Sequence, residues 1–405
     1  MGGYAARSGV AEDTLDPLFC RAIVFSDRAT TVALVALDLL SVSAVWAEPV
    51  RQQIGAQLAC DPTHVLIAAT HTHAGPETVR FRRTHAAALH AYEKTLASTV
   101  VQTAAAAHAA QQVAHLALGA IRVEGVAANR REAHGPVDET VQVLVARTPS
   151  NTCVAVIAVF GCHPTVLPPT NLRYSRDLFG PAVDTAEQVL GARVVLFNGA
   201  AADVSTRFTR QTQDSHEAVR LGRLLGEAIA TAAARAAPIA GTSLCACQEL
   251  VAVEPRSLPS PSEAEENVAQ AGDRVRTLQS REAPAGEQRR AAAELEGALA
   301  QLFLVTHGGA RAVLGHEADR AAIQLLRLGA CDIVAAPGEV FSATGRAIRA
   351  ARPRPTLVVG YANDYLGYFV GPDVAAAGGY EALTAFVAPN SAQAIAQRLA
   401  TIDCS

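Results

Sequence analysis

Residues 67–77 read IAATHTHAGPE, an apolar run that ends in two histidines separated by one threonine. The run has the length and composition of a buried β-strand, and the side chains of a strand alternate between its two faces. His71 and His73 are therefore expected on one face. Two imidazoles on one side can begin a metal site, because neutral imidazole is a common nitrogen ligand. The alternative is a hydrogen-bonded pair of histidines at a strand end.

The composition is that of a globular enzyme rather than a nucleic-acid-binding protein. Half of the 405 residues are hydrophobic, 18% are charged, and the formal net charge is −4. A nucleic-acid partner usually requires a basic patch or stripe, which this balance does not favour. We therefore expect a small-molecule substrate.

Cysteine usage and hydropathy favour a cytoplasmic protein. The eight cysteines form no CxxC motif, and a chain of this length needs no disulfides to hold its core, so we expect reduced thiols. The N-terminus lacks the basic and apolar regions of a signal peptide. No run of ~20 apolar residues is present, so we expect no stable membrane anchoring.

Apolar runs of strand length alternate with helical patterns along the chain. The strand-like runs are 30–37, 64–70, 140–146, 153–160, 192–197, 321–329, 331–336 and 356–360. The helical patterns between them are 87–110, 216–236 and 342–351. This alternation predicts an α/β fold with a twisted, mixed and largely covered sheet flanked by helices. No linker divides the chain, so a single domain over 1–405 is expected.

The segment from about 255 to 313 differs from its surroundings. It starts with a Ser/Pro cluster and the capping-type sequence SPSEAEE, breaks at APAG, and then resumes a helical pattern. We interpret it as a helical hairpin inserted between strands. It is either a lid or a structural insertion.

Polar residues follow several of the predicted strands directly. Ligands in open α/β sheets bind beyond the carboxyl ends of strands, so these residues are candidates for one shared site. They are His71, His73, His163, Asn198, Asp203, Ser205, Glu339, Tyr365 and Tyr368.

Histidines together with a carboxylate suit a hydrolytic zinc site. Glu339 is either a ligand or a simple carboxylate at a helix N-terminus. Asp38 either orients a ligating histidine or pairs with a neighbouring loop.

Barrel amidohydrolases with a bridging lysine are disfavoured, because the only lysine, Lys94, lies in a helical pattern. Metallo-β-lactamase-like enzymes are excluded, because HTHAGP lacks their HxHxDH extension.

The motifs together resemble the catalytic domain of the neutral/alkaline (non-lysosomal) ceramidases. The resemblance rests on GY..R near the start, THTHAGP at 70–76, GCHPT at 161–165, FNGAAADVS at 197–205, PGE at 337–339, NDYLGYFV at 363–370 and GGYEA at 378–382. They occur in the family's order and span nearly the whole chain. Relatives usually carry a C-terminal immunoglobulin-like domain, which we do not expect here.

The resemblance implies a zinc ligand set and several catalytic roles. The implied Zn²⁺ ligands are His71, His163, Glu339 and Tyr368. The implied catalytic residues are His73 beside the metal, Glu339 as a proton acceptor, Tyr380 as a donor to the oxyanion, Arg130 as a substrate contact and Ser205 as the active-site serine.

The function predicted on this basis is zinc-dependent hydrolysis of a linear amide in a small N-acyl or peptide-like metabolite. Departures from the family pattern favour such a substrate over a lipid: the stretch NRREAHGPVDE (129–139) is short, and Ala202 replaces the glycine usual before DVS. True ceramide hydrolysis is the first alternative. An esterase, a lactonase, an acyl-transfer enzyme or a non-catalytic binding protein on the same scaffold are the others.

Overall fold

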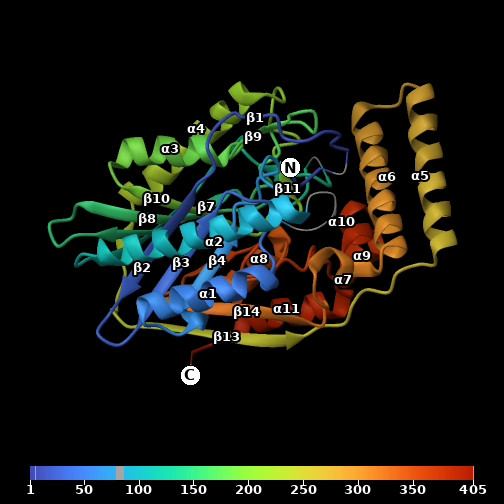
Figure 1. The fold of residues 1–405 in the computed structure, drawn as a ribbon. Coiled ribbons are helices and arrows are strands. Elements are labelled where there is room, and N and C mark those ends of the chain that lie inside the picture. Colours follow the sequence, from blue (N-terminus) through green and yellow to red (C-terminus); the bar gives the residue numbers. More distant parts are fainter. Residues whose placement is uncertain (5, 79–85, 133, 405) are drawn as a thin grey trace.

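The computed structural model describes residues 1–4, 6–78, 86–132 and 134–404, which form alternating strands and helices (Figure 1). The helices are α1 Ala44–Leu58, η1 Pro62–His64, α2 Ala86–Ala109, α3 Phe179–Leu190, α4 Ser215–Ala234, α5 Pro261–Ser280, α6 Ala285–Thr306, α7 Gly309–Leu314, α8 Ser342–Ala351, α9 Pro372–Ala377, α10 Tyr380–Thr384 and α11 Pro389–Thr401. None of these helices is long and apolar enough to cross a bilayer.

The strands confirm the predicted α/β class. They are β1 Asp13–Thr14, β2 Cys20–Ser26, β3 Thr31–Leu37, β4 Val65–Ala69, β5 His115–Arg122, β6 Ala128–Asn129, β7 Thr140–Arg147, β8 Cys153–Phe160, β9 Arg173–Tyr174, β10 Arg193–Asn198, β11 Val204–Ser205, β12 Ala237–Pro238, β13 Leu244–Ala252, β14 Arg320–Leu328, β15 Cys331–Ala335 and β16 Thr356–Val359. Every predicted strand run coincides with an observed strand to within about one residue at each end.

The strands are distributed over several mixed sheets rather than one. The larger sheets have the orders β10-β8-β7-β5-β12, β13-β14-β15-β16 and β2-β3-β4. Each contains a parallel pair: β8 with β10, β15 with β16, and β3 with β4. Parallel strands end at the same edge, so the segments that follow them are brought close together.

Buried side chains from all three larger sheets form one apolar cluster, so the sheets pack against one another. Its members include Leu34, Leu66, Ile157, Val195, Ile333 and Leu357. The other face of the five-stranded sheet packs on α3 and α4, while α1, α2 and α11 cover the opposite side of the molecule (Figure 1). The flanking helices of the prediction are confirmed.

Some elements carried too weak a local signal to be predicted. The strand β5 is only partly buried along its length, and it contains Gly119, a residue that weakens a strand pattern. The helix α1 contains Pro49 beyond its first turn, a residue that normally ends a helical pattern. Both elements form because their apolar side chains find partners in the tertiary structure.

The predicted hairpin is present as α5 and α6. It begins with the expected capping box, in which the Ser260 side chain accepts from the Glu263 backbone and the Glu263 carboxylate accepts from the Ser260 backbone. Figure 1 shows the two helices standing at one side of the molecule, with α5 outermost. On α6, a Cβ at Gly297 would lie 3.3 Å from the Tyr380 Cα, so the hairpin packs closely on α10.

The side chain of Asn198, at the end of β10, connects three strand ends. Its Nδ2 donates to the carbonyls of Thr70 (3.1 Å) and Cys162 (3.0 Å), and its Oδ1 accepts from the Cys162 backbone. Its own carbonyl accepts from the Gly360 backbone N–H at 3.0 Å, just after β16. Asn198 is fully buried, so each of these bonds replaces a bond to water.

We expect Asn198→Asp to lower the free energy of unfolding by about 2–4 kcal/mol, because it removes the Nδ2 donor and turns a carboxylate towards two carbonyl oxygens. Urea unfolding followed by circular dichroism measures the loss. Asn151→Asp is the matched control, because Asn151 is exposed. Equal stabilities of the two variants would contradict this role of Asn198.

Candidate metal centre

His71 and His73 converge, although not by the alternation of a strand. The strand β4 ends at Ala69, and His71 has a φ of +69°, in the left-handed region that residues other than glycine rarely adopt. The Nε2 atoms of His71 and His73 lie 3.2 Å apart. The prediction that the two histidine rings converge is therefore confirmed. The reason given for it, the alternation of side chains along a strand, is wrong, because a left-handed turn at His71 brings the rings together.

His71 and His163 are oriented in the way typical of metal-ligating histidines. The His71 Nδ1 lies 2.7 Å from the Leu40 carbonyl, and the His163 Nδ1 lies 2.8 Å from the Ala201 carbonyl. A carbonyl only accepts, so each Nδ1 carries the proton and each Nε2 of the neutral ring presents a lone pair. Such bonds fix the tautomer and the ring orientation of a ligand.

These two lone pairs point towards the Glu339 carboxylate. Its Oε2 lies 3.1 Å from the His163 Nε2 and 3.8 Å from the His71 Nε2. Within the described residues the buried His163 Nε2 has no hydrogen-bond partner. Three acceptor atoms this close repel one another unless a cation lies among them. The donor set therefore fits a metal ion.

The histidines are neutral at ordinary pH. Burial lowers the pKa of His71 to about 3, and burial also lowers the pKa of His73 and of His163 well below the ordinary value. The ligand atoms of these three histidines lie within 4.8 Å of one another. Neutral imidazole is the form that ligates metals.

Two tyrosines that the motifs did not assign to the ligand set hold Glu339. The Tyr365 hydroxyl donates to Oε1 at 2.6 Å, and the Tyr361 hydroxyl donates to Oε2 at 3.3 Å. The Tyr361 ring also stacks on His71, with centroids 4.2 Å apart. The signal that could have identified them is the density of tyrosines after β16, where Tyr368 follows in the same loop.

Tyr368, Tyr380 and Arg130 lie together. Tyr368 pairs with Glu339 through the backbone, and its hydroxyl accepts from Arg130 Nη2 at 3.0 Å. The Arg130 Nε donates to Glu381 at 2.9 Å, and its guanidinium lies 6.0 Å from the Tyr380 ring centroid. Arg130 thus connects the Tyr368 loop to α10, and burial raises the pKa of Tyr368 well above its ordinary value.

Ser205 is adjacent to the histidines through its backbone. Its strand β11 pairs with His163, and its Oγ accepts from the Arg207 backbone N–H at 3.2 Å. Asp203 faces α8 instead: its Oδ1 accepts from the Ser342 backbone at 2.7 Å. Asp203 therefore anchors the helix that follows Glu339, and the catalytic role of Ser205 stays a prediction.

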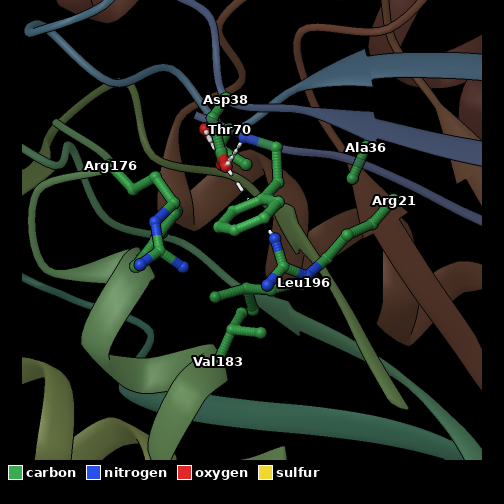
Figure 2. Close-up of a pocket in the computed structure, with 9 residues that line it drawn as sticks. Arg21, Ala36, Asp38, Thr70, Arg176, Val183 and Leu196 are labelled. Carbon is green, nitrogen blue, oxygen red and sulfur yellow. Dashed lines mark hydrogen bonds and ion pairs between the residues drawn. The ribbon is translucent and has the colours of Figure 1, made fainter. Parts of the chain in front are cut away.

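Asp38 does not contact His71, and of its two open roles the structure shows the ion pair. Its carboxylate accepts from the Phe19 backbone at 2.9 Å and from the Thr70 hydroxyl at 3.2 Å, and it lies 4.0 Å from Arg21. Figure 2 shows Asp38 and Thr70 at one end of a small pocket, with Arg21 and Arg176 on its sides. Burial raises the pKa of Asp38 to about 6.

The GY..R motif near the N-terminus packs on His73. A Cβ at Gly3, whose φ is +99°, would lie 2.5 Å from the His73 Cγ, so no side chain fits there. The Tyr4 ring lies 4.9 Å from the His73 ring, and its hydroxyl donates to the Leu167 carbonyl at 2.7 Å. Arg7 in turn lies 5.0 Å from the Tyr4 ring centroid. The motif therefore positions His73.

Fold and site define an α/β protein with a buried histidine–carboxylate centre of the kind found in metallohydrolases. Residues 1–200 match the family described as neutral/alkaline non-lysosomal ceramidase, N-terminal. The match covers 200 of the 405 residues and confirms the resemblance that the motifs had indicated, and the family supports a hydrolase.

Solved ceramidase structures have the same fold. The neutral ceramidase from Pseudomonas aeruginosa superimposes with a TM-score of 0.76 at 18% identity, over 99% of this chain and 70% of that chain. A structure titled "Ceramidase complexed with C2" gives a TM-score of 0.72 at 17% identity, over 98% of this chain and 72% of that chain. At these identities they show the fold alone. No curated protein matches the sequence.

The loop that carries Tyr365 and Tyr368 is fastened by a histidine with a raised pKa. The His316 Nε2 lies 3.0 Å from Asp364 Oδ1, and this hydrogen bond raises the pKa of His316 above its ordinary value. The same Oδ1 accepts from the Ala44 backbone N–H at 2.8 Å. Protonated His316 thus ties this loop to the segment between α7 and β14.

We expect this contact to stabilise the protein most at mildly acidic pH. Because folding raises the pKa of His316, its contribution is complete below the unfolded value of about 6.5 and is lost as the pH rises through the folded value. The difference in melting temperature between wild type and His316→Gln should therefore shrink from about pH 5.5 to about pH 8.5. His90→Gln, at an exposed position, should show no such trend. A difference that grows with pH would contradict the assignment.

Proposed function

We propose that the protein is a zinc-dependent hydrolase of linear amides. The observation that supports it most is the convergence of His71 Nε2 and His163 Nε2 on Glu339 Oε2, with no hydrogen-bond partner for His163 Nε2 within the described residues. Nitrogen ligands with a carboxylate are a typical set for catalytic zinc. In this proposal Tyr368 is the fourth ligand.

Zinc bound there would polarise a substrate carbonyl and lower the pKa of a bound water towards ~7. The chain's own residues hold the site and move protons. Tyr361 and Tyr365 fix the Glu339 carboxylate through both of its oxygens, and in this proposal Glu339 also accepts a proton. Arg130 keeps the Tyr368 hydroxyl in position.

His73 is proposed to return the proton to the leaving amine. Its ring is neutral, lies against His71, and is held by Gly3 and Tyr4, so a proton that it gains is readily released. Tyr380 is proposed to donate to the oxyanion, a contribution typically worth about 3 kcal/mol of the barrier. Ser205 and Arg130 are the remaining proposed contacts to the substrate.

Basic side chains near the site support a small, acidic N-acyl or peptide-like substrate. Arg210 Nη1 donates to the Thr165 carbonyl at 2.7 Å, and Arg207 Nη1 donates to the Arg130 carbonyl at 3.3 Å. In the described part of the chain neither guanidinium forms an ion pair within 4.0 Å. Both guanidinium groups also interact electrostatically with acidic side chains of the chain, Arg207 with Glu381 and Glu296 and Arg210 with Asp177, and in this proposal a carboxylate on the substrate adds to these contacts. Ceramide is the second candidate, favoured by the names of the similar structures. The cytoplasmic location and the single domain stay predictions.

The first test is the metal content of the purified protein. We expect about one Zn²⁺ per chain in the wild type, and loss of that zinc in His163→Ala because a ligand is removed. His115→Ala, at an exposed position, should retain it. Elemental analysis before and after reconstitution gives the result. Wild-type protein that takes up no zinc would refute the proposed centre.

The second test compares two substrates, an N-acyl amino acid and a short-chain ceramide. We expect the zinc-loaded enzyme to hydrolyse the N-acyl amino acid, and His73→Ala to lower kcat by about 10²–10⁴-fold because proton transfer is lost. The zinc content of His73→Ala checks that the centre is intact. Release of the sphingoid base from ceramide alone would instead establish the lipid substrate.

A further inference from the structure

Three cysteines far from the metal centre lie at one edge of the four-stranded sheet. β13 is the edge strand of that sheet, and Cys245 and Cys247 are two residues apart on it, so both point to the same face. On this face Glu249 is paired with Arg398 of α11 at 2.7 Å. The segment that follows α11 therefore lies beside these cysteines, as the position of the C-terminal end in Figure 1 shows.

Cys404, in that segment, contacts both of the strand cysteines. Its side chain interacts with the side chains of Cys247 and Cys245. The Cys247 Sγ also donates to the Asp403 carbonyl at 3.5 Å. All three cysteines are partly exposed, whereas Cys162 and Cys331 are buried. A reagent in solution can therefore reach the trio.

The segment around Cys404 is already anchored. Arg352 Nη1 donates to the Ile402 carbonyl at 3.0 Å, and Arg327 Nη2 lies 2.6 Å from Asp403 Oδ1. Arg327 is also the residue opposite Cys245 on β14. The segment that carries Cys404 is thus fixed beside the face of β13 that carries Cys245 and Cys247, next to the Arg327 guanidinium.

The side chain of Cys404 and the guanidinium of Arg327 favour the thiolate of Cys247, whereas burial, Asp403 and Glu249 oppose it. The pKa of Cys247 is lowered, first by the side chain of Cys404 and further by Arg327. The same contacts raise the pKa of Cys404. A cysteine with thiolate character, exposed and next to a second thiol, has the features of a site that oxidises reversibly.

We propose that Cys247 and Cys404 form a reversible disulfide when the protein meets a hydroperoxide, with Cys245 as an alternative partner for Cys404. The Cys247 thiolate attacks one oxygen of hydrogen peroxide, the O–O bond breaks, and sulfenic acid and hydroxide form, the latter leaving as water. The Cys404 thiol then attacks the sulfenic sulfur, forms the S–S bond and releases a second water. Two thiols are oxidised, one peroxide is reduced to two waters, and a dithiol reductant reverses the reaction.

The test is mild oxidation of the intact protein with hydrogen peroxide, followed by thiol titration under denaturing conditions and non-reducing peptide mapping. Of the eight cysteines, two should become unreactive, and a peptide cross-linked through Cys404 should appear and vanish with dithiothreitol. Cys404→Ser should abolish the cross-link, while Cys153→Ser, at another partly exposed thiol, should preserve it.

Alkylation rates in the wild type keep the proposal testable if Cys404→Ser does not fold. Cys247 should react with iodoacetamide several-fold faster than Cys153 at neutral pH, because more of it is thiolate. Cross-links formed equally among other cysteines, or all thiols still titratable after peroxide, would overturn the proposal. Equal alkylation rates for Cys247 and Cys153 would overturn it as well.

Discussion

The carboxamide of Asn198 is the interaction on which the site depends. Its two donated hydrogen bonds end at Thr70 and Cys162, the residues immediately before His71 and His163. The two histidines come from loops more than 90 residues apart in sequence, and this buried side chain joins those loops. A buried amide that satisfies both donors and its acceptor has one orientation only, because any other leaves polar atoms unpaired.

The candidate metal centre is the complementary constraint. His71, His163 and Glu339 present acceptor atoms to one another, which is unfavourable without a cation. Hydrogen bonds from other parts of the protein keep these acceptor atoms close together despite their repulsion. Backbone carbonyls hold the Nδ1 atoms of the two imidazoles, and tyrosine hydroxyls hold the carboxylate. Binding energy from a metal would therefore also stabilise the fold, since the unfolded chain has no preformed site.

The strands and most long helices could be predicted because their signals are local. The run 153–160 and the helix 342–351 match the observed elements at both ends, since apolar periodicity and flanking turn residues are visible within a short window. The strand β5 and the helix α1 were missed because their local sequences do not show the pattern typical of a buried strand or of an uninterrupted helix. Much of β5 is exposed, and α1 contains Pro49. The division of the strands among several sheets could not be predicted either, because it depends on which strands pair with each other.

The sequence by itself determined the α/β class, the inserted hairpin and the list of polar residues that follow the strands. These are properties of residue type and spacing, which a chain carries whether or not it is folded. Only the tertiary structure decided that Tyr361 and Tyr365 hold Glu339, that Asp38 pairs with Arg21, and that Cys404 reaches β13. Those contacts join residues distant in sequence through loops, and a loop's path, such as the left-handed turn at His71, is fixed by what it packs against.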